Sequence, residues 1–253
     1  MNLIYALMIA FAMYSKIPMP RVDWRKERMR YCLCFFPAIG AVIGVLMILW
    51  MRFGMYLVGN KSFHTAVLIL IPVLVTGGIH LDGFLDTSDA LSSYKSVEEK
   101  LEILKDSNAG AFAVIMGCCY FVLDFGVYSA VRIEAMEILA VGFVLSRAFS
   151  AFAIVNFKKA KTSGLAALFS DMAQKQTITV ACVIYAAACA LVMLYLSVPM
   201  GLAAIGMCGL SFLAYYRMAY RKFGGMTGDL AGFFVQVCEL AMAIGVVVTA
   251  NFM

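Results

Sequence analysis

Residues 178–216 read ITVACVIYAAACALVMLYLSVPMGLAAIGMCGLSFLAYY, a long apolar run without one charged side chain. A helix that spans a bilayer needs about 20 mostly apolar residues, so the run is long enough for two spans. Pro199 divides it, and proline suits the first turn of a helix but not a helix interior. The run therefore predicts a tight helical hairpin formed by 178–197 and 199–216.

Further apolar runs precede and follow this hairpin. With the hairpin they give eight candidate helices, at 2–15, 35–53, 63–78, 111–131, 134–155, 178–197, 199–216 and 230–252. No soluble domain fits between them. We therefore expect an all-α fold, a polytopic transmembrane helical bundle of about eight helices that forms one integral membrane domain over residues 1–253. The first run is short for a span, and a re-entrant or interfacial helix is the alternative there.

The composition agrees with a membrane protein. Apolar residues make up 64% of the 253 residues and charged residues 14%, against about 45–50% and about 25% in soluble domains. The mean hydropathy is +0.91. These values exclude a disordered chain, an ordinary cytosolic enzyme and a nucleic-acid partner, and they make the lipid bilayer the expected surroundings. The eight cysteines form no CxxC pair, and we interpret them as apolar packing residues.

Basic residues lie on alternate connections between the expected helices. The first, third, fifth and seventh connections carry 16 of the 20 lysines and arginines, whereas the even connections carry only Arg52, Lys61 and Arg132. Cytoplasmic connections of membrane proteins are enriched in Lys and Arg. The pattern therefore predicts that the odd connections are cytoplasmic and that both termini lie outside.

The third connection differs from the rest of the chain because it concentrates acidic residues and glycines. Residues 77–91 read GGIHLDGFLDTSDAL and residues 98–110 read EEKLEILKDSNAG, and together they hold seven of the 15 acidic residues. Asp82, Asp86 and Asp89 are spaced i, i+4, i+7, which on a helix places them within an arc of about 60°. Segment 77–110 is therefore the expected cytoplasmic catalytic segment.

Three carboxylates on one helix face repel one another unless a cation binds them. Mg²⁺ prefers carboxylate oxygens and keeps positions for phosphate oxygens and water. The cluster therefore predicts a metal–diphosphate site with Mg²⁺ as cofactor. Gly77, Gly78 and Gly83 beside it let a backbone or a ligand approach closely. A solvated acidic face on a cytoplasmic helix is the alternative interpretation.

Two further polar segments are expected on the same side of the membrane. Residues 224–229 read GGMTGD and open the last helix. Thr227 is placed to cap that helix or to meet a phosphate, and Asp229 lies near its N-terminal end. The second segment contains Lys105, Asp106, Ser107 and Asn108, and it precedes Gly110 at the start of another helix.

These motifs resemble known membrane transferases. The DGxxDxxD pattern is similar to the DGxxAR start of CDP-alcohol phosphotransferases, but Asp86 and Thr87 replace its Ala and Arg, which counts against that family. The segments YSKIPMP (14–20), GGIHLDGFLDTSDAL (77–91), KDSNAGAFAV (105–114) and GGMTGD (224–229) together resemble the cobalamin synthase family, the adenosylcobinamide-GDP ribazoletransferases. The four occur in family order, and the resemblance covers nearly the whole chain.

The resemblance implies a transferase of cobalamin biosynthesis. Such an enzyme transfers α-ribazole, or α-ribazole 5′-phosphate, onto adenosylcobinamide-GDP by Mg²⁺-assisted displacement at phosphorus. It releases GMP and forms adenosylcobalamin or its 5′-phosphate. The implied location is the bacterial or archaeal cytoplasmic (inner) membrane, with the active site facing the cytoplasm. The expected partners are the two small-molecule substrates, and both a homo-oligomer and an association with other corrinoid-assembly enzymes stay open.

The resemblance also suggests roles for the matching residues. Asp82 and Asp86 are the expected Mg²⁺ ligands, and Asp89 is either a third ligand or the base that takes the hydroxyl proton. His80 is interpreted as a phosphate hydrogen-bond donor or as a structural partner of Asp82 or the backbone. Asp106 and Asp229 are further candidates for base or metal ligand.

Substrate contacts are expected from a second set of residues, which are Lys16, Lys105, Thr227, Gly78 and Gly83. The two lysines would balance phosphate charge. Lys16 stands where the family often has Arg, which keeps the charge but loses the bidentate fork. Asn108 stands where an Arg is common, so a cationic phosphate contact there would come from Lys105 or Arg147 instead.

Two carboxylates fall inside expected helices, Asp124 and Glu239. A carboxylate at membrane depth is costly and is a candidate for function, and the alternative is a structural pair with Arg147. A transporter that uses these three residues is the rival function from another class. Gly40 and Gly44 form a GxxxG step, which predicts close helix packing.

Overall fold

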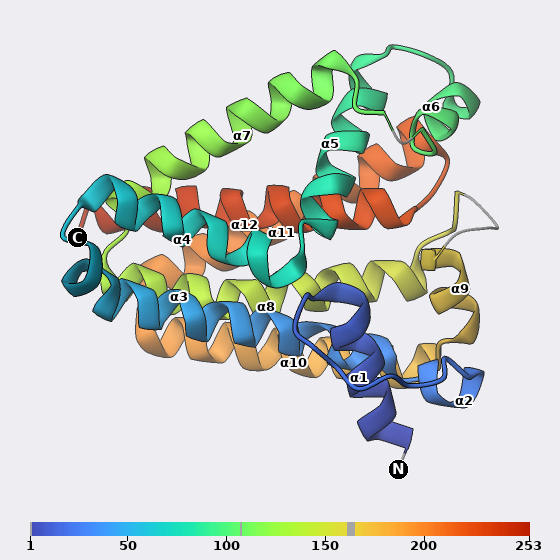
Figure 1. Ribbon diagram of the computed structural model, residues 1–253, viewed down its shortest axis with the longest axis horizontal. Coiled ribbons are helices and arrows are strands. Elements are labelled where there is room, and N and C mark those ends of the chain that lie inside the picture. Colours follow the sequence, from blue (N-terminus) through green and yellow to red (C-terminus); the bar gives the residue numbers. More distant parts are fainter. Residues whose placement is uncertain (1, 107, 161–164) are drawn as a thin grey trace.

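The computed structural model describes residues 2–106, 108–160 and 165–253, and these residues form a helical bundle (Figure 1). Ser107 of the third connection and Lys161 of the fifth lie outside the described residues. The helices are α1 (Asn2–Tyr14), α2 (Lys26–Met29), η1 (Cys32–Phe35), α3 (Phe36–Val58), α4 (Lys61–Thr76), α5 (Ile79–Ser92), α6 (Val97–Ile103), α7 (Ala111–Ala130), α8 (Ile133–Asn156), α9 (Leu165–Met172), α10 (Lys175–Leu196), α11 (Val198–Phe223) and α12 (Gly228–Ala250).

All eight apolar runs are helices, which confirms the all-α polytopic bundle. Within the described part of the chain, six helical segments are each long and apolar enough to span a membrane. The first contains α3, and the other five are α7, α8, α10, α11 and α12. Helices α4 and α5 pass that test only as a pair, and the pair is bent by 95°. Helix α1 has 13 residues and is about 20 Å long, which is less than the bilayer core of about 30 Å.

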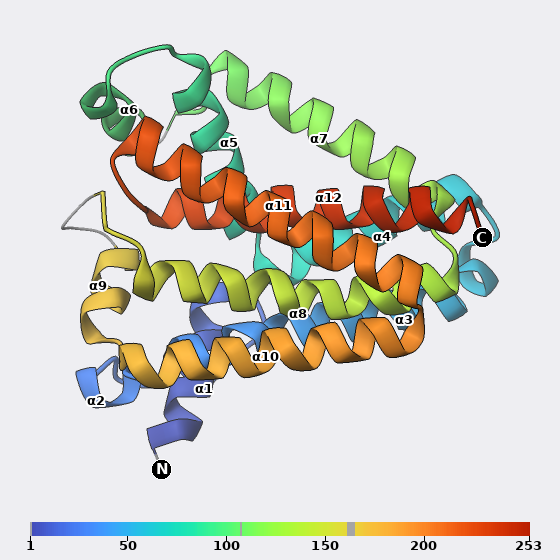
Figure 2. The ribbon, with the colours of Figure 1, turned by 180° about the vertical axis from the view of Figure 1, so that it is seen from behind.

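The figures separate the spanning helices from two helices that run across them. The six long helices share one general direction, whereas α1 and α5 cross it (Figures 1 and 2). Helices α2, α6 and α9 and the basic connections gather at one end, which we call the basic end. The C-terminus lies at the other end. An outside N-terminus requires α1 to span, which its 13 residues and its crossing direction do not favour, so the side of the N-terminus stays a prediction.

The hairpin expected around Pro199 is confirmed. Only Ser197 separates α10 from α11, and Pro199 lies in the first turn of α11. The two helices pack closely after the turn, because a Cβ at Gly201 would lie 2.6 Å from the carbonyl oxygen of Met193. Proline and glycine thus fix the reversal of the chain.

Helix α8 is the most enclosed span, with 78% of its most apolar window buried. Helix α3 packs on it through the GxxxG step. A Cβ at Gly44 would lie 2.6 Å from the carbonyl oxygen of Ala140, and one at Gly40 would overlap the backbone of Phe143. Close helix packing is therefore confirmed as the role of this step.

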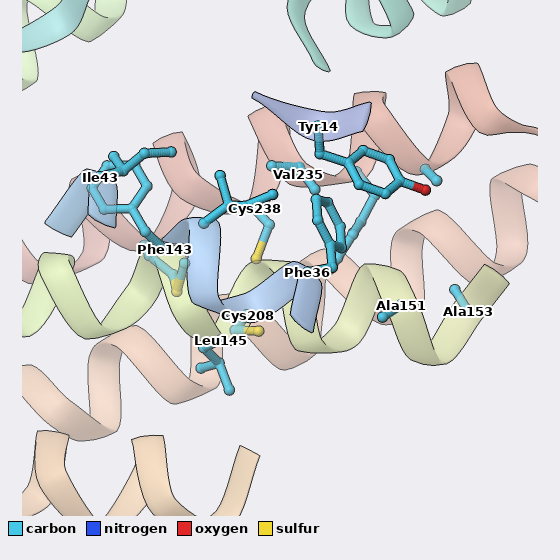
Figure 3. Close-up of a cluster of buried hydrophobic side chains, with 14 of the residues drawn as sticks. Tyr14, Phe36, Ile43, Phe143, Leu145, Ala151, Ala153, Cys208, Val235 and Cys238 are labelled. Atoms are coloured by element: carbon cyan, nitrogen blue, oxygen red, sulfur yellow. The ribbon is translucent and has the colours of Figure 1, made fainter. Parts of the chain in front are cut away.

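Aromatic and sulfur-containing side chains fill the core between α3, α8, α11 and α12. Phe36 packs against Tyr14 of α1, with ring centroids 4.4 Å apart, and Cys208 and Cys238 are buried nearby (Figure 3). All eight cysteines are free thiols. Most of them are buried, as expected for packing residues.

Two consecutive glycines make the bend between α4 and α5. Gly77 has φ 65° and Gly78 has φ 81°. Side chains with a Cβ rarely adopt this left-handed conformation, so two such residues in succession favour glycine at both positions. The turn ends α4 and directs α5 across the basic end of the bundle.

Candidate active site

Helix α5 carries Asp82, Asp86 and Asp89, and its helical fold confirms the face expected from their spacing. Asp82 is exposed, and Asp86 and Asp89 are half-buried. The packed side of α5 presents His80, Gly83, Thr87 and Ser88, which are buried. The carboxylates are therefore held on a rigid element and remain accessible.

Two glycines bring α5 into close contact with the backbone of α12. A Cβ at Gly83 would lie 2.6 Å from the carbonyl oxygen of Asp229 and 3.0 Å from its Cα, and a Cβ at Gly232 would lie 3.2 Å from the Cα of His80. No side chain larger than hydrogen fits at Gly83 without moving backbone. This approach brings Asp229 beside the aspartates of α5. Gly83 thus has a packing role, and its substrate contact stays a prediction.

The GGMTGD segment fixes the start of α12. The Thr227 hydroxyl accepts a hydrogen bond from the Leu230 amide at 3.2 Å and donates to Asp229 Oδ2 at 3.4 Å. The Met226 amide donates to the Lys158 carbonyl at 2.8 Å. Capping by Thr227 is confirmed, and it orients the carboxylate of Asp229. The alternative phosphate contact of Thr227 stays a prediction.

Asp89 joins a third motif to the site. Its carboxylate lies against Gly110, where a Cβ would overlap both carboxylate oxygens. Gly110 is the N-cap residue of α7, and the N-terminus of a long helix favours negative charge. The sequence predicted only that Gly110 lies at the start of a helix. The sequence feature that could have indicated the close approach of Asp89 is the position of this glycine between a polar segment and an apolar helix.

Lys16 joins the fourth motif. Its amide donates to the Val75 carbonyl at 2.7 Å, and its side chain lies along Gly77, where a Cβ would be 2.6 Å from Lys16 Cγ. A cleft of about 550 Å³ opens beside this turn and includes Lys16, Gly78 and Asp82 in its lining. Three residues predicted from two motifs thus share one cleft.

The four carboxylates interact electrostatically around Asp86. The pKa of Asp86 is raised to about 6, chiefly by partial burial and then by the negative charges of Asp82, Asp229 and Asp89. Helix α5 lies across the basic end of the bundle and is not among the six helices that are each long and apolar enough to span a membrane. The repulsion expected from the sequence is therefore present, and it includes a fourth carboxylate from α12.

These carboxylates fit a Mg²⁺ ion that is shared with phosphate. In the described residues, no three His, Cys, Asp or Glu side chains converge on one metal position. A cage made entirely by the protein is thus not formed. Mg²⁺ commonly takes one or two carboxylates and completes its shell with substrate phosphates and water. A set of close but separate carboxylates suits that mode of binding.

Lys105 and Asp106 have local partners on the connection before α7. Lys105 Nζ donates to Glu102 Oε1 at 2.6 Å. The Asp106 carboxylate accepts from the amide and the side chain of Asn108 at 3.0 and 2.8 Å, and these bonds lower the pKa of Asp106. Both side chains are exposed. Their roles as phosphate contact and base stay predictions.

His80 lies inside an aromatic cluster. It is 4% exposed, and its ring centroid lies 5.5 Å from that of Phe36 and 6.4 Å from that of Tyr14. Neither ring nitrogen has a hydrogen-bond partner among the described residues. The expected contact with a phosphate stays a prediction, which this degree of burial does not favour.

Of the two carboxylates inside the bundle, Glu239 forms an ion pair with Arg147, whereas Asp124 forms none among the described residues. Glu239 accepts from Arg147 Nη1 and from Ser146 Oγ, both at 2.6 Å. Arg147 is 1% exposed, so it is held inside the bundle and does not reach a surface phosphate. Asp124 lines a small, mostly apolar cavity with Tyr120 and Glu239. The structural pair is therefore present for Glu239 but not for Asp124.

Comparison with known sequences covers all four motifs. The sequence model of a family described as cobalamin-5-phosphate synthase matches residues 6–247. An adenosylcobinamide-GDP ribazoletransferase of Lachnoclostridium phytofermentans is 45% identical, over 98% of this chain and 95% of that protein. Proteins of the same name from Clostridium botulinum and a Geobacillus species are each 31% identical, over 94% and 87% of this chain and 95% and 86% of their own lengths.

No solved structure matches the chain. Assignment therefore comes from the sequence relationship, which extends over nearly the full length and includes every segment that meets at α5. The chain belongs to the cobalamin-5-phosphate synthase family.

Proposed function

We propose that this chain is an adenosylcobinamide-GDP ribazoletransferase. It joins ribazole, or ribazole 5′-phosphate, to the phosphate that is attached to cobinamide, and it releases GMP. The observation that carries the proposal is the convergence of four separate motifs on α5, through the contacts at Gly77, Gly83 and Gly110. The relatives named for this activity match the chain over all four motifs.

The donor diphosphate is expected beside the four carboxylates. Asp82, Asp86 and Asp229 would hold Mg²⁺, which neutralises diphosphate charge and stabilises the charge that develops on the leaving phosphate. The protein positions these groups through the Gly83 contact and the Thr227 hydrogen bond. Without a cation, their negative charges repel an anionic donor.

The chemical step exchanges two bonds at one phosphorus atom. A ribose hydroxyl oxygen of the acceptor forms a bond to the cobinamide-linked phosphorus, and the bond from that phosphorus to the GMP oxygen breaks. The hydroxyl proton passes to a site carboxylate on the attacking side of that phosphorus. Because a 5′-phosphate on the acceptor is retained in the product, the attacking oxygen is a ribose hydroxyl other than the one at the 5′ position.

The site is proposed to face the cytoplasm of a bacterial inner membrane. The basic connections lie at the same end of the bundle as α5 (Figure 2), and connections rich in Lys and Arg are usually cytoplasmic. Substrates made in the cytoplasm would then reach the site directly. Association with a second copy or with other corrinoid-assembly enzymes stays a prediction, which light scattering of the purified protein tests.

The direct test is product formation by purified protein in detergent. The assay contains adenosylcobinamide-GDP and α-ribazole or its 5′-phosphate, with and without Mg²⁺. We expect GMP release and a cobalamin product only with Mg²⁺, and loss of both in Asp82→Asn. The matched control is Glu98→Gln, which removes an exposed carboxylate from α6 at the same end of the bundle.

Three outcomes separate the alternatives. Mg²⁺-dependent product in the wild type and in Asp82→Asn would keep the activity and move the metal to other carboxylates. Folded wild-type protein that releases no GMP would overturn the proposed function. Transfer from a CDP-alcohol, or flux across vesicles that depends on Asp124, would favour the rival functions.

A further inference from the structure

The cleft beside Lys16 has a composition that selects one kind of ligand. It lies between the end of α1 and the α4–α5 turn and has a volume of about 550 Å³. Its lining includes the apolar side chains of Met13, Leu81 and Leu85 together with the charged Lys16 and Asp82. Pockets of this size usually hold ligands as large as a drug molecule. A complete corrinoid is far larger, so the cleft suits a smaller reactant.

Most polar groups of the cleft are already used by the protein. The Ser15 hydroxyl donates to the Phe11 carbonyl at 2.6 Å, and the Thr76 hydroxyl donates to the Pro72 carbonyl at 2.8 Å. Among the described residues, the Lys16 ammonium makes no ion pair. The cleft therefore offers a ligand apolar surface, one available cation and the exposed carboxylate of Asp82.

These features match the acceptor better than the donor nucleotide. Ribazole 5′-phosphate combines an apolar aromatic base, ribose hydroxyls and one phosphate. Guanine carries several hydrogen-bonding groups, which apolar walls would leave without partners. We propose that the cleft is the acceptor subsite and that Lys16 selects the 5′-phosphorylated acceptor over ribazole. This inference rests on the proposed function and adds to it a residue that determines specificity.

The position of the cleft agrees with an in-line displacement. Asp82 borders the cleft, whereas Asp89 lies farther along α5 at the start of α7. An acceptor with its phosphate on Lys16 would direct a ribose hydroxyl toward Asp82 and the donor phosphorus. GMP would then leave on the opposite side, toward Asp89 and Gly110. The attacking and leaving oxygens need this opposed arrangement.

The test compares acceptor preference in matched variants. Initial rates are measured with saturating adenosylcobinamide-GDP and varied ribazole or ribazole 5′-phosphate, for the wild type, Lys16→Met, Lys16→Arg and Lys95→Met. We expect the wild type to prefer the phosphorylated acceptor in kcat/KM. Lys16→Met should lose about tenfold of that preference, mainly through KM, because a charge-assisted phosphate contact is removed.

The controls identify the cause of any change. Lys16→Arg keeps the charge and should keep most of the preference, and Lys95→Met removes a lysine from the same end of the bundle and should keep all of it. Binding of ribazole 5′-phosphate without donor, followed by its fluorescence, should weaken in Lys16→Met by a similar factor. This second measurement does not require turnover.

Several results would overturn the inference without touching the proposed function. One is GMP release by the wild type with no preference between acceptors. Another is an equal loss for both acceptors in Lys16→Met, which would place Lys16 on the donor diphosphate. Binding of ribazole 5′-phosphate that is unaffected by Lys16→Met would leave the cleft to a lipid or another occupant. Failure of the proposed function itself would appear as absence of GMP release from folded wild type with either acceptor.

Discussion

Asp86 is the carboxylate that the other negative charges of the site affect together. Its carboxylate is half-buried and lies near Asp82, Asp89 and Asp229. The raised pKa means that the ionised form is less favourable in the folded protein than in the unfolded chain. At neutral pH, the metal-free protein therefore carries a repulsion that serves binding and not stability.

Replacement of Asp86 by Asn should stabilise the metal-free protein while abolishing transfer. We expect a gain of about 1 kcal/mol after solvent screening, or a rise of a few degrees in Tm. Mg²⁺ should raise the Tm of the wild type but have little effect on Asp86→Asn. Thermal unfolding in detergent, with and without Mg²⁺, measures both effects. Glu98→Gln is the control, and equal Tm shifts in the two variants would contradict the explanation.

The Arg147–Glu239 pair makes a second prediction at this scale. Both side chains are buried, so Glu239→Gln leaves an unpaired guanidinium inside the bundle and should cost about 3 kcal/mol. Glu137→Gln breaks the exposed pair with Arg52 and should cost less than about 1 kcal/mol. Unfolding in mixed detergent micelles measures the difference.

A double variant separates the pair from other effects of the substitution. Arg147→Met combined with Glu239→Leu removes both charges and should recover much of the stability that Glu239→Gln loses. If the double variant is less stable than the single one, the ion pair is not the reason for the loss.

Gly83 is needed for the close contact between α5 and α12. It permits α5 to reach the first turn of α12, and a methyl group there would meet backbone atoms of Asp229. Gly83→Ala should therefore lower kcat by about tenfold or more, since displacement of α5 by even a fraction of an ångström misplaces the carboxylates. Gly126→Ala is the matched control, because a Cβ there meets nothing within 4 Å, and helix propensity favours the change. Equal activity of the two variants would contradict this role.

The helices show which features of the fold the sequence can predict. The aspartate spacing correctly indicated a helix for Asp82, Asp86 and Asp89, and the apolar runs correctly indicated eight helices. The contacts of Asp229 and Gly110 with α5 could not be predicted from periodicity, because each joins residues that are far apart in the chain. The direction of α5 depends on the conformation of Gly77 and Gly78, and a sequence records the glycines but not the sign of φ.

Across the whole molecule, the main difference from expectation concerns α1. An apolar run of 13 residues has no directional signal, and packing of Tyr14 on Phe36 helps to hold the helix across the bundle. We therefore predict that the chain crosses the membrane with six helices and with the bent pair α4–α5 as one further span. This odd number of crossings would place the two termini on opposite sides.

Reporter fusions test this topology. A reporter before Asn2 should report the cytoplasm, and one after Met253 should report the outside, because seven crossings separate them. A reporter at Lys95, between α5 and α6, should agree with the first. Outside signals from both terminal fusions would restore a spanning α1 and contradict the crossing helix.

The contact between Gly83 and Asp229 joins residues that are 146 positions apart in the chain, since 229 − 83 = 146. At a synthesis rate of about 5–20 residues per second, Gly83 is added to the chain roughly 7–30 s before Asp229. During that interval the carboxylates of α5 have no Asp229 beside them and no helix under Gly83. The site is therefore complete only after the start of α12 has been made, and a chain interrupted before that point lacks Asp229 at the site.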